Sequence, residues 1–274
     1  MGRFLGRAHE KGFRVTTTDI FIKSYRPDFE WLAYCLRFID KFAMEFRGVT
    51  IVVDSPAEVA QLFEMLRPYH FQGQAGYLMV SWHPLPEAPD NWKPDPRFPN
   101  SGTLGYVWQQ AVTLSWMDFT DADAVLVMGS DQGLTGPISP ELLHLEGRPV
   151  RVRRPWGDYG ARQQIWRPSV EYFIGGAVAF DYLCDPAMYY TREATRGFLS
   201  FMRNRFRQTP YEYVLDPRHP QITENGAFGA YLGQIDSHGY VFRFPDQWKS
   251  TIDHRWSWGG LTPEIRADLE ARLA

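Results

Sequence analysis

The first third of the chain alternates short apolar runs with amphipathic helical patterns. Residues 16–22 form a β run, Pro27 disfavours a helix before it, and Asp28 can cap the helix that follows. Over 29–46 the apolar residues recur at helical spacing, and Gly48 supplies a helix stop. The pattern predicts a strand followed by an amphipathic helix.

A second strand and helix follow at once. Residues 49–53 are an uninterrupted, largely β-branched run, which is typical of a buried parallel strand. Ser55 then stands at an N-cap position, Pro56 at the first helical position and Glu58 at the third, and this arrangement starts a helix that runs to about Arg67. Strand, helix, strand and helix in close succession predict an α/β unit with a parallel sheet.

The pattern then continues around one irregular stretch. Residues 76–80 predict a third strand, 104–117 a helix, and 123–128 a fourth strand. Between them, 81–100 carries six prolines and cannot be regular structure. This stretch is either a surface connection or a lid over a ligand site.

The second half loses the regular alternation and is rich in aromatic residues and arginine. We expect helices and loops packed against the same sheet, with a late strand over 175–180. The predicted fold class is therefore α/β, with a Rossmann-like, mostly parallel sheet flanked by helices. We expect a single domain over 1–274, made of two halves over 1–136 and 137–274.

Composition narrows the class of protein. The 274 residues suffice for a core without metal or disulfide support, and a net charge of −3 excludes a polycation. Cys35 and Cys184 lie in apolar surroundings and predict buried thiols. Because no apolar run is long enough to span a membrane and the N-terminus lacks a secretory signal, we expect a cytoplasmic protein. Aromatic residues make up 16% of the chain, and many flank the predicted sheet, where rings can stack on ligands.

Positive charge is concentrated in the middle of the chain. Residues 147–207 hold eleven arginines, no lysine and five acidic residues. Such a run is either a solvated face, a clamp for a diphosphate that includes Arg153 and Arg154, or a groove for a polyanion such as nucleic acid.

Three segments carry a resemblance to a known family. They are "DIFIKSYRPDFEWLAYCLRFI" at 19–39, "GYVWQQAVTLSWMDFTDADAVLVMGSDQGLTGPI" at 105–138 and "ITENGAFGAYL" at 222–232. The chain resembles the nucleotide-sugar-dependent glycosyltransferases of the GT-A fold, and looks most like a poorly characterised bacterial and phage branch of glycosyltransferase-like proteins. This resemblance implies a GT-A-like fold and transfer of a sugar from a nucleotide donor. It also implies that 1–136 is the nucleotide-sugar-binding half and 137–274 the acceptor-side half.

The resemblance also implies a metal site after the fourth strand. The family places an Asp-x-Asp there to hold Mn2+ or Mg2+ against the departing diphosphate, whereas this chain has Gly129 in place of the first carboxylate. Asp131 is then the expected metal ligand, and His254 or its neighbour Asp253 is the candidate for a second ligand. Asp131 is otherwise an ordinary turn aspartate.

Further site residues follow from the same resemblance. Glu224 stands at a predicted helix start, where it is expected to act as the base of an inverting transfer or serves only the helix dipole. The expected donor-binding residues lie after the first, second and fourth strands: Lys23, Ser24, Tyr25, Asp54 and Ser130. The aromatic segment 256–260 either folds over a sugar or packs as C-terminal structure.

The sequence thus predicts a glycosyltransferase with a nucleotide sugar as donor, expected to be UDP-linked. The acceptor is expected to be a saccharide or a nucleic acid, for example a hydroxymethylated base in phage DNA. The alternative is a catalytically impaired protein that binds nucleotide sugars or glycans, because the first aspartate of the metal motif is missing.

Overall fold

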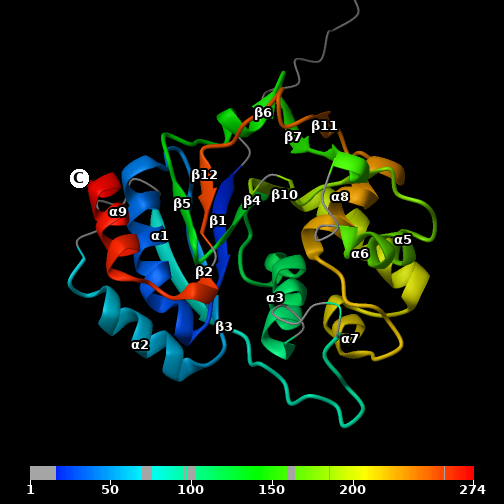
Figure 1. Cartoon of the computed structure of the whole chain (residues 1–274), viewed down its shortest axis with the longest axis horizontal. Helices are drawn as coiled ribbons and strands as arrows, with labels where there is room; N and C mark the ends of the chain where they lie inside the picture. Colours follow the sequence, from blue (N-terminus) through cyan, green and yellow to red (C-terminus); the bar gives the residue numbers. More distant parts are fainter. Residues whose placement is uncertain are drawn as a thin grey trace, which may run out of the picture.

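A five-stranded sheet forms the centre of the computed structural model, which describes residues 17–69, 76–95, 97, 103–158, 164–184, 186–255 and 257–274 (Figure 1). Its strands stand in the order β10-β4-β1-β2-β3, and β1 to β4 run parallel while the edge strand β10 is antiparallel to β4. The strands are β1 (Thr18–Lys23), β2 (Gly48–Val53), β3 (Tyr77–Trp82), β4 (Ala124–Gly129) and β10 (Met188–Thr191). The predicted α/β class with a mostly parallel sheet is confirmed.

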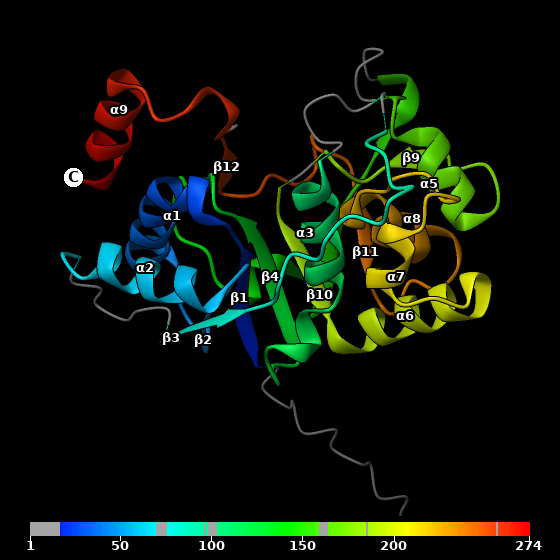
Figure 2. The ribbon, with the colours of Figure 1, turned by 90° about the horizontal axis from the view of Figure 1, so that it is seen from below.

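Helices cover both faces of the sheet, as Figure 2 shows. One face carries α1 (Phe29–Phe42), α2 (Pro56–Leu66) and α9 (Pro263–Leu273). The other face carries α3 (Leu104–Leu114), α5 (Arg167–Ile174), α6 (Arg192–Phe206), α7 (Pro210–Leu215) and α8 (Glu224–Gln234). The described residues also contain short 3-10 helices: η1 (Arg26–Asp28), η2 (Trp116–Asp118), η3 (Glu141–Leu143), η4 (Trp156–Asp158) and η5 (Ser257–Gly259).

Alternation along the buried strands builds two cores. Side chains of successive strand residues point to opposite faces, so Ile20 and Ile22 join the core under α1 while Phe21 joins the core under α3. In β4, Leu126 likewise joins the core under α1 and Val127 joins the core under α3. This two-sided burial is the reason why the strands are continuous apolar runs.

Smaller strand pairs extend the fold beyond the main sheet. The antiparallel pair of β5 (Gln132–Leu134) and β12 (Ile252–His254) brings the C-terminal part of the chain back beside the end of β4 (Figure 1). The other pairs involve β6 (His144–Leu145), β7 (Arg148–Val152), β8 (Arg154–Pro155), β9 (Phe180–Asp181) and β11 (Val241–Arg243).

Several predicted boundaries are wrong. The helix predicted over 104–117 ends at Leu114, and a 3-10 helix follows it. The first helix ends at Phe42, because Ala43 bridges to Ile138 and the N–H of Met44 donates to the Ile138 oxygen over 2.8 Å. Gly48 is not a helix stop but the first residue of β2.

The predicted late strand over 175–180 is also wrong. Gly175 has φ of 88° and ends α5 in the left-handed conformation, which glycine adopts without strain. Only Phe180 belongs to a strand there, the short β9. The strand that joins the main sheet is β10, which sequence patterning missed because it is only four residues long.

Ser55 accepts from the N–H of Glu58 and caps α2 as predicted. Cys35 is buried and Cys184 is half-buried, and the described residues contain no disulfide. No helix in the described part of the chain is long and apolar enough to cross a membrane. Residues 1–16 and Trp256 of the aromatic segment lie outside the described residues.

Candidate functional site

The order in which the chain adds strands to the sheet reverses between β1 and β4. From β1 the chain adds β2 and β3 on one side, and then returns to place β4 on the other side. In open parallel sheets, ligands bind at the carboxyl ends of the strands at such a switch point. Lys23 is the last residue of β1, and the segments that follow β1 and β4 there contain Ser24 to Asp28 and Ser130 to Asp131.

Asp131 is held in place by the returning C-terminal segment. Its Oδ2 accepts from the N–H of Ser257 over 3.1 Å, and its main-chain oxygen accepts from the N–H of Arg255 over 3.0 Å. His254 ends β12 opposite Gln132, and its Nε2 lies 3.4 Å from Asp131 Oδ1. The sheet pair β5 and β12 therefore brings together the two residues that the resemblance implied as metal ligands.

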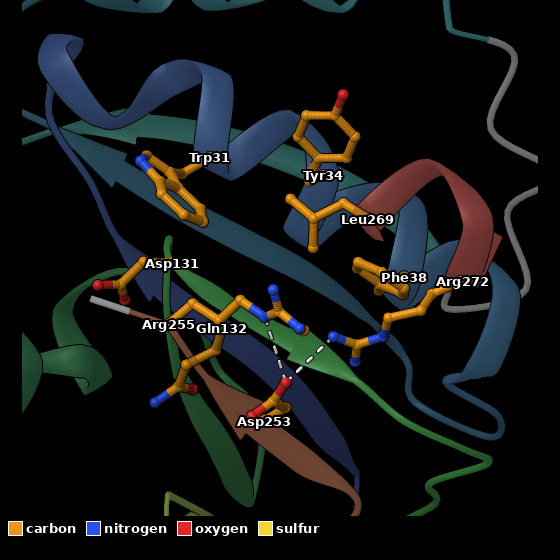
Figure 3. A pocket seen from close by; sticks show the side chains of 10 residues that line it. Trp31, Tyr34, Phe38, Asp131, Gln132, Asp253, Arg255, Leu269 and Arg272 are labelled. Carbon is orange, nitrogen blue, oxygen red and sulfur yellow. Dashed lines mark hydrogen bonds and ion pairs between the residues drawn. The ribbon is translucent and has the colours of Figure 1, made fainter. Parts of the chain in front are cut away.

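A small pocket lies behind Asp131, between α1 and α9 (Figure 3). Trp31 and Phe38 of α1 form one wall. Asp253, the alternative metal ligand, is part of the same pocket, where it accepts from Arg272 Nη1 over 3.0 Å and from Arg255 over 3.4 Å. These contacts give Asp253 a structural role in joining β12 to α9.

The pair Asp131 and His254 fits a divalent cation. Two ligands that each lie about 2.1 Å from one ion stand about 3.0 to 3.4 Å apart, and the two side chains are 3.4 Å apart. A carboxylate oxygen with an imidazole nitrogen suits a transition ion such as Mn2+ better than Mg2+, which prefers oxygen ligands. Within the ranges described, no group of three or more metal-ligating side chains gathers. Water or oxygen atoms of a ligand would have to complete the coordination.

Asp28 belongs to this group, although the sequence suggested only a capping role. Its side chain does not cap α1, and its Oδ2 instead accepts from the hydroxyl of Ser130 over 3.0 Å. Burial raises the pKa of Asp28, the charge of Asp131 raises it further, and hydrogen bonds from Ser130, Ser257 and Tyr25 oppose the rise. A second carboxylate thus stands beside Asp131, from a different loop than the family motif uses.

Tyr25 borders the same group from the solvent side. Its side chain is 41% exposed. The pKa of Tyr25 is raised by burial first, and then by the charges of Asp28, Asp131 and Asp54. An exposed ring beside these carboxylates is available for a planar ligand.

Lys23 and Asp54 form an ion pair at the ends of β1 and β2. Lys23 is 5% exposed, and its Nζ donates over 2.7 Å both to Asp54 Oδ1 and to the main-chain oxygen of Ser24. Burial lowers the pKa of Lys23, while the charge of Asp54 raises it. One oxygen of Asp54 is therefore engaged by the lysine. Ser24 is buried beside the pair, and its hydroxyl has no partner among the residues described.

The two arginines expected in the donor site lie elsewhere. The guanidinium of Arg153 stacks 4.1 Å from the ring centroid of Phe180 and 5.0 Å from that of Phe242. Arg154 belongs to β8 and is paired with Asp181 of β9. These contacts hold both arginines among β7, β8 and β9, on other elements than the carboxylates that follow β1 and β4.

Glu224 begins α8, as predicted, and is 8% exposed. Its N–H donates to Gln110 Oε1 of α3 over 3.0 Å. Burial raises the pKa of Glu224 to about 7, although the helix N–H groups and the charge of Arg151 lower it. A carboxyl with a pKa near neutrality can take up a proton at pH 7.

Arg151 of β7 is a buried residue that contacts the first turn of α8. It is 2% exposed, and its Nη2 donates to the main-chain oxygen of Asn225 over 2.8 Å. Part of the arginine-rich stretch is therefore core structure, whereas Arg203 and Arg205 of α6 are exposed.

A cavity of about 540 Å3 is lined in part by residues 220–222, the segment that leads into α8. The proline-rich loop supplies one wall, α3 supplies Val107, and the segment after α7 supplies the other wall. Trp92 of the loop donates from Nε1 to the Val214 oxygen over 3.3 Å, which ties the loop to α7. Residues 91–95 of the loop therefore line a cavity in addition to connecting β3 to α3.

No known family model matches this chain, and no curated protein matches it. The site has to be interpreted from its own geometry. Of the expected donor residues, those after β1, β2 and β4 gather at the switch point, and Arg153 and Arg154 do not. Asp28 escaped sequence reasoning because its position before a helix already explained it as a cap.

Proposed function

We propose that this protein is a nucleotide-sugar-dependent glycosyltransferase of the GT-A type, with a UDP-linked donor. The observation that carries the proposal is the 3.4 Å approach of His254 Nε2 to Asp131 Oδ1 at the switch point of the sheet. This edge is where a doubly wound sheet binds nucleotides, and the sequence resemblance implies a nucleotide sugar.

The donor would lie across the ends of β1 and β4. The exposed ring of Tyr25 offers a stacking surface for a base, and Asp54 retains Oδ2 for a ribose hydroxyl or a base imide while Oδ1 holds Lys23. Ser130, oriented by Asp28, stands beside Asp131 to contact a phosphate.

Asp131 and His254 would hold the divalent cation, which supplies positive charge against the diphosphate as it leaves. The carboxylate of Asp131 is already oriented by the N–H of Ser257. Orientation of a ligand by its own hydrogen-bond partner is what a precise metal site requires.

Glu224 would serve as the base. As the acceptor oxygen bonds to the anomeric carbon, the bond from that carbon to the diphosphate oxygen breaks, the nucleoside diphosphate leaves, and the acceptor proton passes to Glu224. This is an inverting displacement. The pKa of Glu224, about 7, leaves a large ionised fraction near neutral pH.

Hydrolysis and binding assays test this proposal together. UDP-sugars are incubated with and without Mn2+, and UDP binding is measured by calorimetry. We expect slow, Mn2+-stimulated release of UDP that Glu224→Gln and Asp131→Asn reduce at least a hundredfold. UDP binding without any turnover would support the alternative, a binding protein that has lost catalysis. Absence of UDP binding would overturn both.

A further inference from the structure

Two matching tripeptides contribute to the cavity before α8, whose lining includes Asp95 and residues 216–218. The sequence Asp-Pro-Arg occurs at 95–97 in the proline-rich loop and again at 216–218 after α7. In both, the arginine N–H donates to the aspartate Oδ1 over 3.0 Å, and the guanidinium binds the same carboxylate. The aspartate and the arginine of each tripeptide thus form an internally neutral ion pair.

The described wall of the cavity carries little net charge. Its charged residues are Lys93, Asp95, Asp216 and Arg218. Arg97 pairs with Asp95 and Arg218 with Asp216, which leaves Lys93 as the one uncompensated charge among the described residues of the wall. His219 adds none at neutral pH, because burial lowers the pKa of its imidazole. A polyanion such as nucleic acid gains its affinity from contacts with many positive charges, whereas the described wall offers a single lysine beyond its ion pairs.

The lining of the cavity also contains the flat rings of Trp92, Tyr213 and His219. Trp92 lines the cavity and is fixed by its bond to Val214. His219 stacks on Tyr213 with ring centroids 4.5 Å apart and planes 1° apart. The guanidinium of Arg218 is oriented by Asp216 while its side chain is 78% exposed. Rigid rings next to oriented donors suit a ligand with apolar C–H faces and hydroxyl edges.

The cavity is also joined to the proposed base. Gln221 and Ile222 line it, and Glu224 follows two residues later. On α3, Val107 lines it, while Gln110, one turn further, accepts from the N–H of Glu224. A ligand in this cavity would therefore lie beside the start of α8.

We propose that the cavity lined by Trp92, Arg218 and His219 binds a neutral saccharide, which is the acceptor of the transfer. Its volume of about 540 Å3 lies within the roughly 300–1,000 Å3 that small-molecule sites occupy. The role as acceptor site rests on the proposed function, whereas saccharide binding by this cavity does not.

Binding to a glycan array, followed by titration of the best glycan, tests the inference. We expect one or more neutral glycans to bind, and Trp92→Ala and Arg218→Ala to weaken that binding at least tenfold. Phe63→Ala removes an exposed ring from α2 on the opposite face of the sheet and should leave glycan binding unchanged. Thermal melts and UDP binding show whether each variant is folded.

The outcomes separate this inference from the proposed function. If no glycan binds, or if both variants bind glycan as the wild type does, the cavity is not a saccharide site. Salt-sensitive binding of a DNA oligonucleotide that Trp92→Ala abolishes would replace the saccharide with nucleic acid. Glycan binding lost in the variants, without UDP turnover by the wild type, would support the cavity and contradict the transferase.

Discussion

His254 Nε2 stands 3.4 Å from Asp131 Oδ1, although the two residues come from distant parts of the chain. The antiparallel pairing of β12 with β5 makes this approach, and the N–H of Ser257 fixes the second oxygen of the same carboxylate. A carboxylate and an imidazole at this separation either share a cation or form an ion pair when the imidazole is protonated.

Removal of either ligand should weaken Mn2+ binding. We expect Asp131→Asn and His254→Ala each to raise the Kd for Mn2+ in the presence of UDP about tenfold or more, since two protein ligands cannot be reduced to one without loss. Electron paramagnetic resonance of free Mn2+ measures this directly. Asp253→Asn is the matched control, because it removes a neighbouring carboxylate that binds Arg272 instead. Equal Mn2+ affinity in all four proteins would show that the pair is only an ion pair.

Tyr25 should contribute its ring rather than its hydroxyl to nucleotide binding. Stacking on a base is worth about 1–3 kcal/mol, so Tyr25→Ala should weaken UDP binding about tenfold. Tyr25→Phe keeps the ring and loses the hydrogen bond to Asp28, and it should weaken binding less than threefold. Calorimetric titration with UDP distinguishes them, and a loss in Tyr25→Phe as large as in Tyr25→Ala would refute the stacking role.

The buried carboxyl of Glu224 should make stability fall with rising pH. Its folded-state pKa, about 7, lies above its ordinary value of 4.5, so the native state binds more protons between these values and the free energy of unfolding falls as pH rises through them. The full cost, about 3 kcal/mol, is present above pH 7. Glu224→Gln should remove this slope and be more stable than the wild type at pH 8 but not at pH 4. Urea unfolding at both pH values decides, and parallel pH profiles would contradict the prediction.

Lys23 should be needed for stability as well as for the site. Lys23→Met leaves the carboxylate of Asp54 without its partner at the end of β2, which should cost about 2–4 kcal/mol. The double variant Lys23→Met, Asp54→Leu should recover most of this loss because no uncompensated charge remains. Urea denaturation of the two variants measures both effects, and equal stabilities would show that the ion pair does not carry the loss.

Gly229 should be indispensable to the burial of α8. A Cβ there would stand 2.4 Å from the Cβ of Tyr182, so Gly229→Ala should destabilise the protein by about 1–3 kcal/mol through overpacking. Gly105→Ala in α3 is the control, since nothing lies within 4 Å of its added Cβ, and it should be neutral or stabilising by up to about 1 kcal/mol. Thermal melts compare the two, and similar shifts in Tm would contradict the packing argument.

Local patterns along the sequence determined the order of β1, α1, β2, α2 and β4. Apolar periodicity and capping depend on neighbours a few residues apart, so Ser55 caps α2 where the sequence predicts. The start of α8 at Glu224 was expected from the family resemblance. The position of Asp131 after the fourth strand follows from the same reasoning. The approach of His254 rested on the family resemblance, because no local pattern links it to Asp131.

Only the tertiary structure decided what these residues touch. Asp28 turns from a cap into a partner of Ser130, and Lys23 occupies one oxygen of Asp54. Arg153 stacks on Phe180, a contact that the sequence did not indicate. Each of these contacts joins segments that are distant in sequence, and its energy depends on how separate elements pack, which no local periodicity encodes. The sequence therefore determined which polar side chains follow the strands, and packing determined which of them face one another.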